Sequence, residues 1–326
     1  MLGASGFAGA LAAYLIWRHP GFELTAVTAR AEAGQPLQEV YPRYRVPLVL
    51  ETLDLDRHAE VDAAIVAYPH AAAAPVVAAM RSRGVRVVDL SADFRLADLA
   101  TYERWYTTHP APELLREAVY GLTELHREAI AGATIVASPG CYPTASVLGL
   151  APLARAGLIA DVVIDAKQGI SGSGRTPTAE THLSQAGENI TPYKVDGHRH
   201  TPEIEEQLAL LGADLAVQFT PHLVALDQGE LVSCYVTPTR PVAQAELREL
   251  YSASYAGEPF VELADAPPGV REVRETNYCR IHALVHEHTG KLLVFSALDN
   301  LWKGTSSQAV QNLNLMFGLA ETDGLT

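Results

Sequence analysis

One cysteine stands where its thiol could act as a nucleophile. Cys141 lies in the segment Ser138-Pro-Gly-Cys-Tyr-Pro-Thr144, which joins a run with strand character to a run with helical character. The first backbone amides of a helix, together with the helix dipole, stabilise a thiolate. The flanking Pro and Gly residues predict an exposed turn, whereas Cys234 and Cys279 lie in apolar runs typical of buried cysteines. The pattern predicts that Cys141 is a catalytic nucleophile with a stabilised thiolate.

A base for such a thiol is available in the segment Gly197-His-Arg-His-Thr-Pro-Glu203. His198 and His200 stand just before an amphipathic run, with Thr201 as a candidate helix cap and Pro202 suited to the first turn. Histidine is a common general base near neutral pH. No further ligands cluster with this pair, so we expect no metal; ordinary surface histidines are the alternative.

The glycines Gly3, Gly6 and Gly9 precede an apolar helical run over residues 10–17. Glycines at that point let the backbone approach a pyrophosphate, which then sits at the helix N-terminus. A structural turn is the alternative, because a glycine triplet alone is weak evidence. About 20 residues further on, where such sites select their cofactor, Thr28 and Arg30 favour the phosphate of NADP(H) over NAD, although Glu32 is near.

A cysteine thiolate combined with a nicotinamide site predicts an enzyme that interconverts an aldehyde and an acyl derivative through a thioester. A dinucleotide fold also needs a strand directly before Gly3, and only Met1 and Leu2 stand there. We therefore expect the true start of the chain to lie upstream of Met1, unless this strand is replaced in another way.

A second glycine-rich segment, Gly169-Ile-Ser-Gly-Ser-Gly-Arg175, combines hydroxyls, a guanidinium and backbone freedom. This composition is typical of a loop that holds a phosphate or a carboxylate, and a flexible solvated loop is the alternative. The segment Asp299-Asn-Leu-Trp-Lys-Gly304 places further polar groups before the last helical run.

The order of apolar runs predicts the elements that position these residues. Strand and helix runs alternate at first, which is typical of a parallel sheet covered by helices. Longer strands follow from about residue 157, including a hairpin at 288–290, and indicate an antiparallel or mixed sheet. The expected strands cover 22–28, 63–67, 85–90, 134–137, 162–166, 215–219, 230–238, 277–287 and 291–298; the expected helices cover 10–17, 72–83, 144–156, 243–255 and 305–317.

Composition limits the class of protein. The 326 residues carry a net charge of −14 without a long basic block, so we expect neither a nucleic-acid partner nor a membrane anchor. The uncharged stretch 129–154 is interrupted by Pro139, Gly140 and Pro143, which predicts a buried strand, a turn and a helix. Three cysteines without paired spacing and no signal sequence favour a cytoplasmic protein.

The chain resembles the N-acetyl-gamma-glutamyl-phosphate reductase family, type 1, of the aspartate-semialdehyde dehydrogenase-like superfamily. The resemblance rests on five segments in order: GASGFAG from Gly3, DLSADFR from Asp89, ASPGCYPTA from Ala137, HRHTPEI from His198 and DNLWKG from Asp299. It implies an α/β chain with a Rossmann-type doubly wound parallel sheet over 1–140 and 300–326. It also implies an α+β catalytic and oligomerisation domain with a mixed or antiparallel sheet over 141–299.

The resemblance further implies NADPH-dependent reduction of N-acetylglutamyl phosphate, a small acyl phosphate, with release of phosphate. Cys141 would be the nucleophile, and His200, with His198 as second choice, the acid or base. The implied cofactor residues are Gly3, Ser5, Gly6, Phe7, Ala8, Thr28, Arg30, Pro69, Ser91 and Asn300, and the implied substrate residues are Ser171, Gly172 and Arg175. A homo-oligomer, dimer or tetramer, is expected.

Three alternatives stay open at this point. A related reductase of lysine biosynthesis acts on aminoadipyl phosphate held by an acidic carrier protein, which the net charge of −14 disfavours. A phosphorylating dehydrogenase for aspartyl phosphate would differ in what its pocket accommodates. A non-catalytic NADP-binding sensor would leave Cys141 and the two histidines unexplained.

Overall fold

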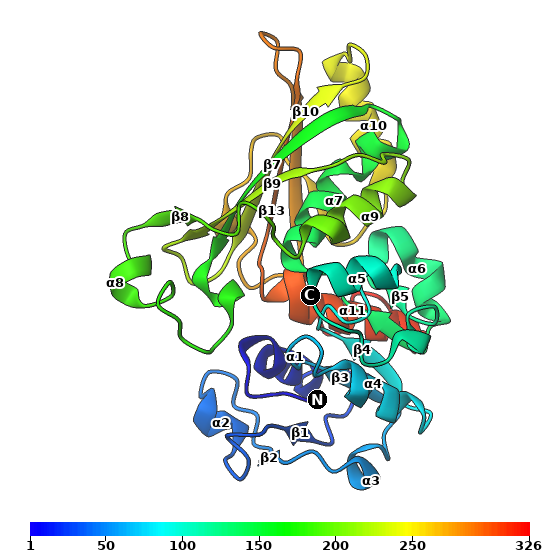
Figure 1. Cartoon of the computed structure of the whole chain (residues 1–326), viewed down its shortest axis with the longest axis vertical. Coiled ribbons are helices and arrows are strands. Elements are labelled where there is room, and N and C mark those ends of the chain that lie inside the picture. The colour runs from blue at the N-terminus through cyan, green and yellow to red at the C-terminus, as the bar shows by residue number, and fades with distance from the viewer. The chain divides into compact units, whose positions relative to one another are not determined.

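The computed structural model describes residues 1–326, which form two compact units. Unit 1 comprises Met1–Gly140 and Thr305–Thr326, and unit 2 comprises Cys141–Gly304. Figure 1 shows the first and last parts of the chain, blue and red, in the same unit.

Unit 1 contains a parallel sheet. Four strands pair in the order β3-β4-β6-β5, and β1 pairs with β2, all in parallel. The strand bounds are β1 Val27–Thr28, β2 Leu50–Glu51, β3 Ala63–Val66, β4 Arg86–Asp89, β5 Val119–Tyr120 and β6 Ile135–Ala137. The predicted parallel sheet is therefore confirmed.

The place between β1 and β3 is filled by Leu2, which forms parallel bridges to Thr28 and Val66. Beside it lies a cavity of about 590 Å³ whose lining includes residues 21–26 and 60–65. The strand predicted over 22–28 is therefore wrong over most of its length. Only Val27 and Thr28 are paired, because residues 22–26 border this cavity and not a neighbouring strand.

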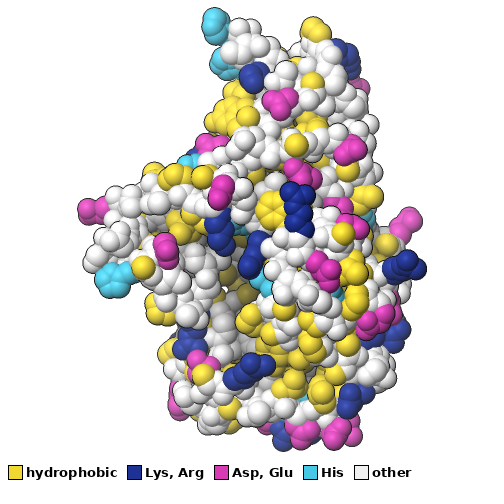
Figure 2. Space-filling view, viewed as in Figure 1, with side chains coloured by type: hydrophobic (Ala, Val, Ile, Leu, Met, Phe, Trp, Pro, Cys, Tyr) yellow, Lys and Arg dark blue, Asp and Glu magenta, His cyan; other side chains and the backbone are white.

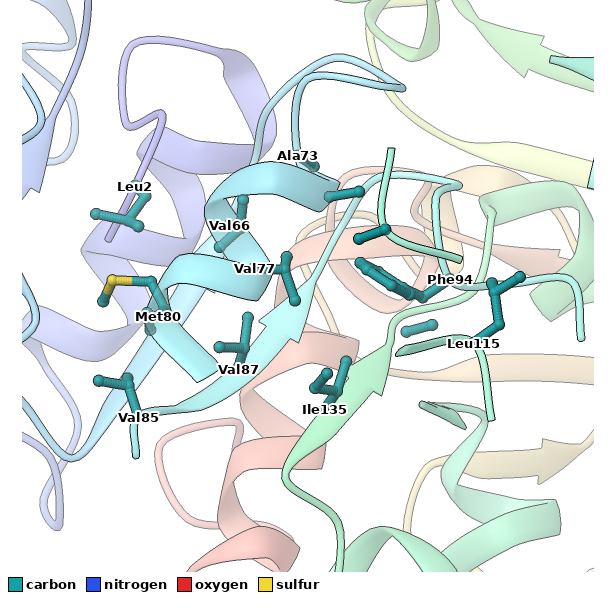
Figure 3. Packing of buried hydrophobic residues seen from close by; sticks show 14 residues of the cluster. Leu2, Val66, Ala73, Val77, Met80, Val85, Val87, Phe94, Leu115 and Ile135 are labelled. Carbon is teal, nitrogen blue, oxygen red and sulfur yellow. The ribbon is translucent and has the colours of Figure 1, made fainter. Parts of the chain in front are cut away.

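The helix bounds in unit 1 are α1 Phe7–Trp17, α2 Leu37–Val40, α3 Leu55–His58, α4 Ala74–Arg81, α5 Leu99–Trp105, α6 Thr123–Ala131 and α11 Ser307–Met316, with a 3₁₀ turn at Pro112–Leu114. Of these helices, α4, α6 and α11 contact strands of the parallel sheet, and α1 contacts α11. Figure 3 shows the core between α4 and the strands, where Val77 and Met80 lie close to Val66, Val87 and Ile135. All five side chains are at least 95% buried, as in a continuous apolar core.

Unit 2 contains a mixed seven-stranded sheet in the order β11-β12-β13-β10-β7-β9-β8. The β7–β9 and β11–β12 pairs are parallel and the others antiparallel, so the predicted mixed sheet and the β12–β13 hairpin are confirmed. The strand bounds are β7 Ile159–Gly169, β8 Ile190–Pro192, β9 Gln218–Val224, β10 Glu230–Pro238, β11 Val261–Leu263, β12 Cys279–Val285 and β13 Leu292–Leu298.

Helix α7 packs across the middle of this sheet, against β7, β10 and β13, and α9 and α10 contact α7 (Figure 1). The helix bounds are α7 Cys141–Arg155, α8 Leu183–Ala186, α9 Thr201–Leu210 and α10 Gln244–Ser254, with 3₁₀ turns at Ile170–Ser173 and Val270–Glu272 and a π-helical turn at Trp302–Ser306. The uncharged stretch 129–154 comprises the last residues of α6, then β6, a turn and most of α7.

None of the helices combines the length and the apolar character needed to cross a bilayer. On the face drawn in Figure 2, basic and acidic side chains are interspersed, and neither kind forms a continuous patch.

Candidate active site

Cys141 is the first residue of α7, directly after the turn that follows β6. Its sulfur accepts a hydrogen bond from Nε2 of Gln168, at 2.8 Å, and the residue is partly exposed. Gly304 lies against it, because a Cβ at Gly304 would stand 2.8 Å from the Cβ of Cys141. The thiol is therefore held at a helix start, beside an amide donor and a residue without a side chain.

The register of the sheet explains why Gln168 meets Cys141. Gln168 on β7 lies directly opposite Glu230 on β10, so both side chains lie on the same face of the sheet. This is the face on which α7 packs, since α7 contacts β7, β10 and β13. Gln168 and Glu230 were not predicted from the sequence, because only the pairing of two distant strands brings them together.

Glu230 is fully buried, and neither of its carboxyl oxygens forms a hydrogen bond of ordinary geometry. Burial raises its pKa to about 8, and the nearby Asp299 adds to the shift. Burial, and then the Glu230 carboxyl, raise the pKa of Cys141 well above its ordinary value. The helix amide of Tyr142 and the amide of Gln168 act in the opposite direction but do not prevail. The structure therefore favours the thiol form of Cys141, in contrast to the predicted stabilised thiolate.

The two predicted histidines lie in one aromatic cluster but differ in environment. His198 is buried against Tyr142, Tyr193 and Phe219, and its Nδ1 accepts the backbone N–H of His200 at 3.1 Å. Burial lowers its pKa to about 3, so its ring is neutral. His200 is only partly buried, and its ring meets those of His198 and Tyr142.

His200, and not Thr201, is the residue that caps α9. The predicted cap is therefore wrong by one residue, since Thr201 already belongs to the first turn of the helix and Pro202 follows it there. The His200 side chain makes no capping hydrogen bond.

The glycine-rich loop after β7 is held by hydrogen bonds to two other segments of unit 2. Oγ of Ser171 donates to the carbonyl of Asp227 at 2.6 Å and accepts from Nδ2 of Asn300 at 3.0 Å. Oδ1 of Asn300 in turn accepts the backbone N–H of Gly229 at 2.8 Å. Asn300 thus links two loops of unit 2 with both ends of its amide, and its contact with the nicotinamide stays a prediction.

The other two predicted substrate residues are exposed. A Cβ at Gly172 would overlap the side-chain amide of Gln168, so this glycine leaves room for the group that donates to Cys141. The guanidinium of Arg175 lies at the surface of the loop.

In unit 1 the glycine triplet forms a tight turn before α1. Gly3 has a φ of +86° and approaches Ala67 so closely that a Cβ would stand 2.5 Å from its carbonyl oxygen. A Cβ at Gly9 would overlap the carbonyl oxygen of Gly3. Gly6 is the N-cap residue of α1 and offers no side-chain cap. A Cβ at Gly6 would meet open space, and no acidic residue stands in the first turn. Such a helix start suits the pyrophosphate of a dinucleotide, and Ser5, Phe7 and Ala8 flank it.

The remaining predicted cofactor residues fall into two groups. Arg30 and Pro69 are exposed, and the Arg30 guanidinium lies 5.9 Å from the centre of the Tyr68 ring. Thr28 and Ser91 are buried, and their hydroxyls bind protein groups: Oγ1 of Thr28 accepts the N–H of Gly3 at 3.3 Å. Oγ of Ser91 donates to Asp89 at 2.6 Å. Arg30 is thus free to meet a phosphate, whereas Thr28 and Ser91 shape the backbone.

The segment from Asp89 to Arg95 forms a buried network. Asp93 accepts the backbone N–H groups of Ala71 and Ala74, at 2.7 and 2.9 Å, at the start of α4. Arg95 donates to the carbonyl of Ser138 at 2.7 Å, in the turn before Cys141.

Side chains of His, Cys, Asp and Glu nowhere gather in a group of three that could hold a metal.

Comparison with known families identifies the class of the chain. Residues 1–133 match the family described as semialdehyde dehydrogenase, NAD binding domain, and residues 141–300 match semialdehyde dehydrogenase, dimerisation domain. The fold is similar to that of aspartate semialdehyde dehydrogenase II from Vibrio cholerae, with a TM-score of 0.74, 18% identity and 97% of both chains covered. The Candida albicans enzyme, solved with NADP, gives a TM-score of 0.71 at 16% identity, again over 97% of both chains. The chain is thus an oxidoreductase of the semialdehyde dehydrogenase class.

Sequence relatives narrow this class. The N-acetyl-gamma-glutamyl-phosphate reductase of Desulforudis audaxviator is 48% identical, with 100% of this chain and 96% of that protein covered. The reductase of Moorella thermoacetica is 46% identical with the same coverage. The chain belongs to the N-acetyl-gamma-glutamyl-phosphate reductase family.

Proposed function

We propose that the protein reduces N-acetyl-L-glutamyl 5-phosphate to N-acetyl-L-glutamate 5-semialdehyde with NADPH and releases phosphate, a step of arginine biosynthesis. The observation that carries the proposal is Cys141 at the start of α7 with the Gln168 amide 2.8 Å from its sulfur, in a chain whose relatives bear this name. The thiolate would attack the acyl carbon, expel phosphate and leave the acyl group on sulfur as a thioester.

The chain's own groups supply the rest of the site. Gln168 donates to the sulfur, and the glycine turn with the uncapped start of α1 and Arg30 would hold NADP(H), which supplies the hydride when bound. We assign the proton of the substrate oxygen to His200, because His198 is a buried neutral ring whose Nδ1 is already an acceptor. Arg175 is exposed and would bind an anionic group of the substrate.

The reverse reaction tests the proposal with stable reagents. Purified protein should reduce NADP⁺ with N-acetylglutamate semialdehyde only when phosphate is present. Cys141→Ser should lose more than about 1,000-fold of this turnover, whereas Cys234→Ser, at a buried strand position, should retain it. Activity with the aspartyl or aminoadipyl analogue in place of this substrate would overturn the substrate assignment. Turnover in Cys141→Ser would overturn the mechanism.

We further propose a homo-oligomer formed through the sheet of unit 2. The face opposite α7 carries Val163, Tyr235, Leu293 and Phe295, which lie beside one another on β7, β10 and β13 and are only partly buried. The match to a dimerisation domain supports pairing of this face with a second copy. Sedimentation should show a dimer or tetramer that Tyr235→Glu dissociates; an unchanged assembly would exclude this face.

A cytoplasmic location is proposed as well, in keeping with the three free thiols at Cys141, Cys234 and Cys279.

A further inference from the structure

Glu230 has no part in the reaction as described above, yet it lies against the reacting thiol. It is fully buried at the start of β10, and its two oxygens have no hydrogen bond of ordinary geometry. A buried carboxyl without an ion-pair partner costs free energy, so its presence in a core position calls for a function.

The position of this carboxyl follows from the sheet and not from a loop. Glu230 pairs with Gln168 on one side and with Leu298 on the other, both in antiparallel register. Gln168 and Glu230 therefore reach Cys141 together, the first as an N–H donor and the second as a carboxyl that interacts with the thiol. A hydrogen-bond donor and a proton acceptor beside one sulfur are what thiolate formation requires.

No cation is among the groups that interact with Glu230. The groups that interact with it are the Cys141 thiol, the Asp299 carboxyl and the hydroxyls of Tyr142 and Tyr193. All of these are neutral or acidic, so the carboxyl has no ion-pair partner that would fix it as a carboxylate. A proton can therefore move between the carboxyl and the thiol.

We propose that Glu230 is a catalytic residue that takes the proton of the Cys141 thiol as the thiolate attacks, and returns it when the thiolate leaves. This rests on the proposed role of Cys141. The S–H bond breaks and a carboxyl O–H bond forms, while the sulfur electron pair makes the C–S bond. In the last step the C–S bond breaks, its electron pair returns to sulfur, and the carboxyl gives the proton back. His200 keeps the separate task of serving the substrate oxygen.

The ionisation of the pair fits this exchange. The pKa of about 8 at Glu230 lies near the operating range of a general base, and the thiol titrates above it. Because the two groups are coupled, the first proton lost belongs to the pair. In that state the remaining proton rests mainly on the sulfur, so the carboxylate of Glu230 is available to accept it when the thiol attacks.

The test uses the full-length protein with Glu230→Gln and two readouts. Loss of the proton acceptor should lower kcat for the phosphate-dependent reaction about 100-fold. Loss of the neighbouring negative charge should lower the pKa of the thiol, so alkylation of Cys141 by iodoacetamide at pH 8, followed by mass spectrometry, should become about 10-fold faster. Slower turnover with a more ionised thiol is expected only for a proton acceptor.

The other outcomes overturn the proposal. A fall in both readouts would give Glu230 a merely structural role, and a rise or no change in turnover would make it an electrostatic neighbour only. The wild-type enzyme offers a second measurement, because kcat/KM for the semialdehyde should rise with pH toward about 8; a flat profile between pH 6.5 and 9 would contradict the exchange. Glu124→Gln, a carboxyl buried in unit 1, is the matched control and should leave both readouts unchanged. Failure of the proposed function would appear separately, as turnover that survives Cys141→Ser.

Discussion

The glycine turn of unit 1 and the cysteine site of unit 2 are encoded in different ways. The turn is contiguous, and its shape depends on backbone: Gly3 needs its positive φ, and Gly9 needs the missing Cβ. The cysteine site depends on side chains from α7, β7 and β10, brought together by the register of the sheet. A backbone site can thus be seen in a short motif, whereas a site made of side chains depends on tertiary pairing.

Beyond Cys141 and Glu230, the largest effect is expected at Gln168, also in the cysteine site. Its Nε2 donates to the Cys141 sulfur at 2.8 Å, so Gln168→Leu removes a donor that stabilises the thiolate. We expect kcat of the phosphate-dependent reaction to fall about 100-fold with a smaller change in KM. Steady-state kinetics of the purified variant measures this. Gln244→Leu, at an exposed position on α10, should behave as wild type, and equal losses in the two variants would remove Gln168 from the site.

The next effect concerns the backbone of the glycine turn. Gly9→Ala places a methyl group on the carbonyl oxygen of Gly3, and we expect this overlap to lower the free energy of unfolding by about 1–3 kcal/mol and to weaken NADP⁺ binding. Gly6→Ala meets open space and should change stability by less than about 0.5 kcal/mol. Urea denaturation compares the two variants. If Gly6→Ala still weakens NADP⁺ binding, its methyl group intrudes on the cofactor; equal stability of both variants would disprove the packing argument.

These two expectations also show what the sequence could reveal. The parallel sheet, the mixed sheet and the place of Cys141 at a helix start follow from apolar periodicity and from Pro and Gly positions, which are local signals. Glu230 and Gln168 gave no such signal, because a buried Glu in a strand looks like any exposed one until the strand is paired. The structure contrasts with the thiolate prediction for the same reason: helix amides are local, but burial and a carboxyl from another strand are not.

For some residues of the motifs, the predicted role in cofactor binding stays a prediction. Thr28, Ser91 and Asn300 belong to segments that the sequence singled out, yet their polar atoms bind the protein itself. Residue type and spacing cannot distinguish a hydroxyl that faces a ligand from one that supports the backbone. An exposed residue is therefore the more useful test of cofactor binding in unit 1.

Arg30 provides that test with a smaller effect. Its guanidinium lies over the Tyr68 ring and would meet the extra phosphate of NADP. Arg30→Gln should weaken NADPH binding about 10-fold and leave NADH binding unchanged, because a charged hydrogen bond contributes about 1.5 kcal/mol. Arg18→Gln is matched, since Arg18 is also exposed and lies 5.6 Å from the Tyr14 ring centre. Fluorescence titration with both cofactors measures the ratio, and a similar loss for NADPH and NADH would contradict the phosphate contact.

The smallest expected effect concerns Asp89, a buried carboxyl that differs from Glu230 in its hydrogen bonds. Asp89 accepts hydrogen bonds from the backbone N–H and the hydroxyl of Ser91, whereas Glu230 has none of ordinary geometry. Burial raises the pKa of Asp89 to about 7, above its ordinary 3.8. At pH values between these two pKa values, the folded chain keeps a proton that the unfolded chain has released. The free energy of unfolding therefore falls as pH rises through this range.

Asp89→Asn removes this titration. From pH 6 to pH 7, the free energy of unfolding of the wild type should fall by about 1 kcal/mol relative to the variant. Urea denaturation at both pH values measures the difference. Asp62→Asn, at an exposed position, is the control, and the gap between its free energy of unfolding and that of the wild type should stay constant. A constant gap for Asp89→Asn as well would mean that Asp89 is ionised in the fold. Asp89→Asn should change turnover only as far as it changes stability, because Asp89 supports the backbone of its own segment. Glu230→Gln should instead lower turnover and raise the reactivity of the thiol, because Glu230 acts on the reacting sulfur.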